Sequence, residues 1–162
     1  MNIGRTDYFC GAFLAYLVSN RVGPTLFDAG ESSKIIRFSS GDKDYKAFVK
    51  FCTTLQKSRH GKRWDIGISK NEAPILETFE EEGRENIVVV VCTDAKFGET
   101  VFAVFPVKVA KACLGNDRVN ENRRISICHI ANTARLEIYG TAVDRKDCYQ
   151  VDRCCDKYFG FR

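Results

Sequence analysis

The sequence predicts an α+β fold whose sheet is mostly antiparallel and has about seven strands, with about four helices. Three observations support this class. Residues 87–92 form the continuous run Ile-Val-Val-Val-Val-Cys, which is typical of a strand buried on both faces. Residues 45–53 alternate between the two faces of a strand. The strand-like runs also follow one another through short polar turns, as consecutive hairpins do.

The first expected element is a helix that begins at Thr6 or Asp7 and runs to about Asn20. Because this helix is apolar nearly all round, we expect it to be packed on more than one side. Residues 34–38 and 45–53 then predict a hairpin. The other expected elements are strands at 64–68, 87–92, 101–105, 124–130 and 135–141, and helices at 73–82, 106–114 and 144–159.

Length and composition indicate one domain that spans residues 1–162. Most of the eight cysteines lie inside apolar runs, where a cysteine acts as a small hydrophobic side chain. We therefore expect free buried thiols and a cytoplasmic protein. The apolar stretch 8–18 is shorter than the about 20 residues that span a bilayer, so we expect no membrane partner.

The segment 57–64 concentrates positive charge in a chain whose formal net charge is only +4. We expect it to project as a loop between two strands and to contact nucleic acid or an acidic protein surface. The lysines and arginines would bind phosphates, and the only tryptophan would stack on a base. The candidate binding residues are Lys57, Arg59, His60, Lys62, Arg63 and Trp64. The leading hypothesis is therefore a small binding protein.

A second, acidic patch between residues 77 and 85 leaves two other possibilities open. This patch could itself be the interface of the protein with a partner. Alternatively, both charged patches could be ordinary solvated surface.

A metal-dependent nuclease is the alternative hypothesis. Asp65 lies in one predicted strand, and Asp94-Ala95-Lys96 follows the buried strand 87–92. Two carboxylates can hold Mg²⁺, and a lysine two residues further on can steady the scissile phosphate. Asp65 with Asp94 and Lys96 resembles the D…(D/E)-x-K pattern of restriction-endonuclease-like nucleases. The same Asp and Lys also fit an ordinary polar turn.

Other chemistries lack their patterns in this chain. The sequence contains no C-x2-C pair, and Cys148 and Cys155 would lie about 10.5 Å apart along the predicted last helix, too far to share one zinc ion. It also contains neither of the glycine-rich phosphate-binding motifs. Apart from Mg²⁺ under the nuclease hypothesis, we therefore expect no metal and no cofactor.

Overall fold

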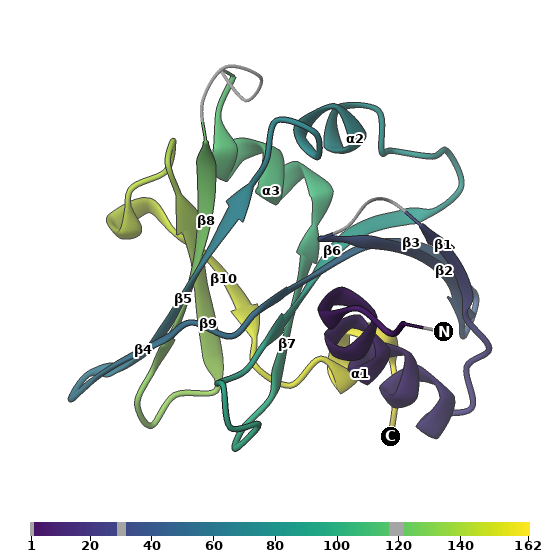
Figure 1. Cartoon of the computed structure of the whole chain (residues 1–162), viewed down its shortest axis with the longest axis horizontal. Helices are drawn as coiled ribbons and strands as arrows, with labels where there is room; N and C mark the ends of the chain where they lie inside the picture. The colour runs from purple at the N-terminus through teal and green to yellow at the C-terminus, as the bar shows by residue number, and fades with distance from the viewer. Residues whose placement is uncertain (1, 29–31, 117–121) are drawn as a thin grey trace.

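The computed structural model describes residues 2–28, 32–116 and 122–162, and it confirms the α+β class. Within these residues the strands form two five-stranded sheets, more strands than the sequence predicts. Figure 1 shows the two sheets beside one another, with α2 and α3 at the top and α1 at the lower right. All strand pairs are antiparallel except one.

Sheet 1 has the strand order β1-β2-β3-β6-β7. The predicted hairpin is present as β2 and β3, and the run of β-branched residues forms β6, which is buried on both faces as expected. The one parallel pair is β3 with β6, because the chain builds β4, β5 and α2 before it returns to sheet 1. The strands are β1 (Thr25–Asp28), β2 (Lys34–Ser40), β3 (Lys43–Cys52), β6 (Glu85–Cys92) and β7 (Val101–Pro106).

Sheet 2 has the strand order β10-β9-β8-β5-β4. Its centre consists of the three predicted strands at 64–68, 124–130 and 135–141. Two strands that the sequence analysis missed lie at its edges, β4 and β10. The strands are β4 (Leu55–Ser58), β5 (Gly61–Ile68), β8 (Arg123–Ile130), β9 (Arg135–Gly140) and β10 (Tyr149–Asp152).

Sheet 1 lies between two apolar cores. One face packs against sheet 2 together with α2 (Ala73–Glu77) and α3 (Val107–Leu114). The other face packs against α1 (Arg5–Ser19) and α4 (Asp156–Phe159). No helix in the described part of the chain is long and apolar enough to cross a membrane.

The helix α1 is at the predicted place, but the expectation that it is packed on more than one side is wrong. Its buried face includes Phe9, Phe13 and Leu17, which cover sheet 1. The opposite face is open, and Tyr8 and Val18 are exposed there. Packing in the core therefore does not account for the apolar side chains on this face.

The predicted last helix, 144–159, is also wrong. Residues 145–147 form a 3₁₀ turn, β10 pairs with β9, and only 156–159 are helical. The apolar spacing of this segment fits a helix, but Val151 instead packs against the core between the sheets from an edge strand. Pairing with β9 supplies backbone hydrogen bonds that no local pattern predicts.

Two lysines of β3 are tied to carboxylates on the same side of sheet 1. The Nζ atom of Lys50 donates to Glu72 at 2.7 Å and to the Gly67 carbonyl at 2.8 Å. Glu72 also accepts hydrogen bonds from the Ser69 amide and the Ser32 hydroxyl. This buried ion pair joins β3 to the chain between β5 and α2.

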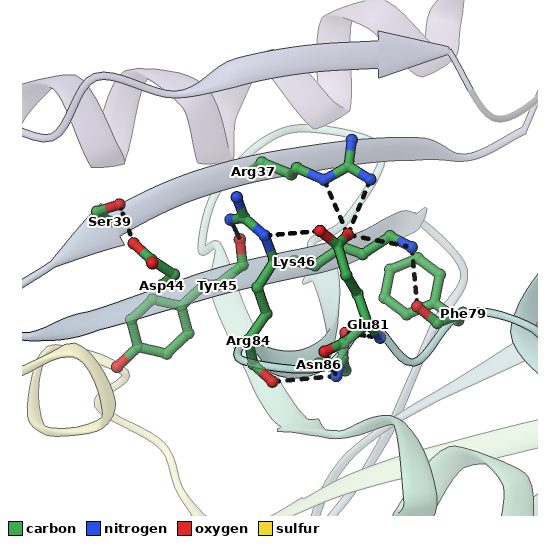
Figure 2. A network of polar contacts seen from close by, with 9 residues as sticks. All are labelled: Arg37, Ser39, Asp44, Tyr45, Lys46, Phe79, Glu81, Arg84 and Asn86. Atoms are coloured by element: carbon green, nitrogen blue, oxygen red, sulfur yellow. Dashed lines mark hydrogen bonds and ion pairs between the residues drawn. The ribbon is translucent and has the colours of Figure 1, made fainter.

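The second lysine, Lys46, shares its carboxylate with two arginines. Figure 2 shows Arg37, Lys46 and Arg84 around Glu81. Lys46 also donates to the Phe79 carbonyl at 2.8 Å, and its Nζ lies 4.4 Å from the centre of the Phe79 ring. Glu81 therefore keeps two cationic partners if Lys46 is removed, whereas among residues 2–28, 32–116 and 122–162 Lys50 is the one cation in ion-pair contact with Glu72.

Candidate functional site

The basic segment is a β-hairpin, so the prediction of a loop is wrong over most of its length. Strands β4 and β5 pair from Leu55 with Trp64 to Ser58 with Gly61, which leaves Arg59 and His60 as the turn. Gly61 has a φ of +146°, and a Cβ atom there would lie 2.1 Å from the His129 carbonyl oxygen of β8. The hairpin thus depends on glycine at this position and on the ladder to β8.

Strand alternation divides the basic residues between the two faces of sheet 2. Lys57 and Lys62 are paired and share the inner face with Trp64. Gln56 and Arg63 are paired on the outer face. The segment therefore presents two basic surfaces joined at the turn, rather than one flexible patch.

Trp64 is 1% exposed and belongs to the core between the sheets. Its Nε1–H donates to the Thr93 carbonyl at 2.9 Å. The expectation that this ring stacks on a base is therefore wrong, because neither face of the ring is accessible.

A cavity of about 180 Å³ lies beside the hairpin, with Arg63 and Cys128 in its lining. Arg145, from the 3₁₀ turn far along the chain, completes it. Its Nε donates to Glu137 at 2.8 Å, which raises the pKa of the guanidinium. Burial raises the pKa of the Cys128 thiol, although Arg145 and Arg63 oppose this. The cavity is lined by cationic side chains, and burial disfavours the thiolate form of its cysteine.

The guanidinium of Arg63 is only partly satisfied by the protein. The Nη2 atom of Arg63 donates to the side-chain oxygen of Gln56 at 2.6 Å and lies 3.3 Å from a carboxylate oxygen of Asp65. The Nε atom is buried and has no hydrogen-bond partner among the described residues. The Arg63 side chain is otherwise 42% exposed and lines the adjacent cavity, so its accessible guanidinium donors can bind an anion there.

Five cations surround the hairpin, and three carboxylates lie in ion-pair contact with them. Lys62 pairs with Glu99, Arg63 with Asp65, and Arg145 with Glu137. In the described part of the chain, Lys57 and Arg59 have no carboxylate within ion-pair distance, and Arg59 Nε donates to His60 Nε2 at 2.9 Å. The site keeps an excess of positive charge. Arg145 was missed because the sequence placed it in a helix, and no local signal connects it to the hairpin.

The two carboxylates of the nuclease hypothesis make separate sets of hydrogen bonds. Asp65 accepts hydrogen bonds from Ser126 and Gln56 on the outer face of sheet 2. Since Trp64 points toward the end of β6, its neighbour Asp65 points away from it. The Asp94 carboxylate instead accepts the backbone amides of Lys96 and Gly98, at 2.9 and 3.0 Å, within its own loop.

These two amide hydrogen bonds lower the pKa of Asp94. Across residues 2–28, 32–116 and 122–162, no group of three or more His, Cys, Asp or Glu side chains is placed to hold a metal ion. Neither carboxylate therefore belongs to such a group.

Comparison of the chain with models of protein families, with curated proteins and with solved structures found no match.

Proposed function

We propose that this chain is a binding protein whose β4–β5 hairpin holds an anionic polymer, in the first place the phosphate backbone of a nucleic acid. The observation that carries this proposal is the cavity that is lined together by the cationic side chains Lys57, Lys62, Arg63 and Arg145. Two guanidinium groups at one cavity suit the tetrahedral oxygens of a phosphate. Lys57 and Arg59 would extend the contact along the polymer.

The size of the cavity supports a phosphate as the unit that is recognised. Its volume of about 180 Å³ is enough for a phosphate group, and it lies below the about 300–1,000 Å³ of pockets that enclose larger ligands. The contact would therefore read the backbone and carry no base specificity of its own.

An acidic protein surface is the other partner that the same cations would suit. The nuclease hypothesis has no comparable support, because Asp65 and Asp94 are engaged separately. The eight free cysteines support a reducing, cytoplasmic setting for the protein.

The test is the salt dependence of binding to a fluorescein-labelled oligothymidylate, measured by anisotropy between 50 and 200 mM NaCl. Each neutralised phosphate of a single strand contributes about 0.7 to the slope of log K against log salt concentration. The Lys57→Ala/Arg59→Ala variant should therefore lower this slope by about 1.4. A matched variant, Lys70→Ala/Lys108→Ala, removes two exposed lysines away from the hairpin and should leave the slope unchanged.

An equal slope for the wild type and the hairpin variant would contradict the proposal. Binding to polyglutamate but not to the oligonucleotide would assign the hairpin to an acidic protein. Fragments of the oligonucleotide that appear only with Mg²⁺ would restore the nuclease hypothesis.

A further inference from the structure

Two aromatic rings lie exposed and in contact on the surface of sheet 1 and α1. Tyr8 is 60% exposed and Phe97, in the loop between β6 and β7, is 53% exposed. Their ring centres are 5.4 Å apart, with an angle of 60° between the planes. Exposed large apolar side chains that gather in one place mark binding surfaces more often than single ones do.

The two exposed rings rest on a rigid layer of further rings. Phe9 stacks on Phe97 at 5.5 Å and on Phe51 at 4.7 Å. The guanidinium of Arg5 lies 5.6 Å from the centre of the Phe9 ring. Arg5, Tyr8, Phe9 and Phe97 line an open hollow of about 540 Å³. We call these four residues the aromatic platform.

The backbone of Phe97 is held in a conformation that a large side chain rarely adopts. Its φ is +57°, in the left-handed region. The Asp94 carboxylate fixes this loop by accepting the amides of Lys96 and Gly98. A strained backbone that holds an apolar ring in solvent does not stabilise the fold, and strain of this kind gathers at binding and active sites.

The same loop connects the aromatic platform to the basic hairpin. Its Glu99 forms an ion pair with Lys62, and Lys57 contributes to the low pKa of Asp94. In Figure 1 this loop, between β6 and β7, lies between the tip of β4 and α1. The platform and the cations of the hairpin are thus on neighbouring surfaces.

The charge of the platform is also complementary to a polyanion. Arg5 donates to the Thr53 hydroxyl at 2.7 Å, and among the described residues no carboxylate is in ion-pair contact with it. Flat rings beside unpaired cations are the combination that binds single strands, since the rings take bases and the cations take phosphates. A duplex would not offer its bases, because they are already stacked on one another.

We propose that the aromatic platform stacks the bases of a single-stranded nucleic acid whose phosphates contact the β4–β5 hairpin. This inference rests on the proposed function and names its ligand as single-stranded. Tyr8 and Phe97 take the role that the sequence assigned to Trp64. Stacking on these rings tolerates any base, because every base has a π-face.

The test compares two labelled strands of equal length by anisotropy, an oligothymidylate and the corresponding abasic strand. The wild type should bind the oligothymidylate more tightly. Tyr8→Ala and Phe97→Ala should each weaken binding of the oligothymidylate by about fivefold or more, and leave binding of the abasic strand unchanged. The control is Tyr149→Ala, which removes a 39% exposed ring from β10, outside the platform. Thermal unfolding of each variant confirms that it is folded.

Equal affinity of the wild type for the two strands would overturn the platform and leave phosphate binding by the hairpin intact. If Tyr149→Ala and the platform variants lost the same amount of affinity for the oligothymidylate, the proposed role of the platform would also be wrong. Absence of binding to both strands, together with binding to polyglutamate, would overturn the platform and the nucleic-acid function together. Tighter binding of duplex than of single-stranded DNA would overturn the platform alone.

Discussion

Replacement of Lys50 by methionine should destabilise the protein by about 3 kcal/mol. The side chains of Lys50 and Glu72 are only 9% and 5% exposed, so Lys50→Met leaves a carboxylate buried without its cation. Loss of one partner of a buried ion pair costs about 3–5 kcal/mol. We expect the lower end, because Glu72 keeps its hydrogen bonds from Ser69 and Ser32.

The matched control is Lys46→Met on the same strand. Glu81 would keep Arg37 and Arg84, so this variant loses chiefly the hydrogen bond to the Phe79 carbonyl (Figure 2). A hydrogen bond from a charged donor contributes about 1.5 kcal/mol at the lower end of its range. The two lysine variants should therefore differ by about 1.5 kcal/mol in the free energy of unfolding, measured with urea at pH 7.

The pH dependence follows from the ionisation of Glu72. Burial alone would raise its pKa, but the hydrogen bonds from Lys50 and Ser32 outweigh burial and hold the pKa below its usual value of 4.5. The ionised pair thus contributes its full stability above that value and loses it as the pH falls through the pKa of the folded state. In Lys50→Met the buried carboxyl should have a raised pKa and become protonated as the pH falls.

Both effects reduce the difference in the free energy of unfolding between the wild type and Lys50→Met as the pH is lowered from 7 toward 4. The double variant Lys50→Met/Glu72→Gln removes both charges and should be more stable than Lys50→Met alone at pH 7. The reasoning is refuted if Lys50→Met costs no more than Lys46→Met. It is also refuted if the double variant is no more stable than Lys50→Met.

Two further predictions concern the core and the thiols. Trp64→Phe should lower the free energy of unfolding by about 1–3 kcal/mol, because the Thr93 carbonyl loses its buried donor. The affinity of this variant for oligothymidylate should equal that of the wild type. A loss of affinity in the folded variant would show that the indole contacts the ligand. Iodoacetamide should modify the exposed Cys154 first, as followed by mass spectrometry of the native protein. Burial raises the pKa of Cys10 to about 12 and that of Cys155 to about 11, so earlier modification of either would contradict the packing described above.

The parts of the fold that the sequence predicted are those with a local signal. The β-branched run at 87–92 and the alternation at 45–53 each identify a strand without reference to any other segment. The hairpin at 55–68 has such a signal only from Trp64 onward. Its β4 strand is polar and at an edge, and it forms because β5 is fixed by the ladder to β8. Pairing between distant segments is not visible in a local pattern.

The candidate site was predictable in its charge and not in its aromatic part. Trp64 lies on one face with Ile66 and Ile68, a sign of burial that the expectation of a base-stacking tryptophan left unused. Phe97 is an isolated large apolar residue in a polar loop, a signal that was available in the sequence. The contact between Phe97 and Tyr8 could not be predicted from the sequence, because no local pattern brings α1 to the loop after β6.

The most direct measurement for the central claim is a titration of the ¹⁵N-labelled protein with oligothymidylate, followed by two-dimensional NMR. The account predicts that amide shifts concentrate in residues 57–63 and 94–98 and around Tyr8. Shifts confined to other elements, such as α3 at 107–114, would contradict the claim that the hairpin and the aromatic platform form the binding surface.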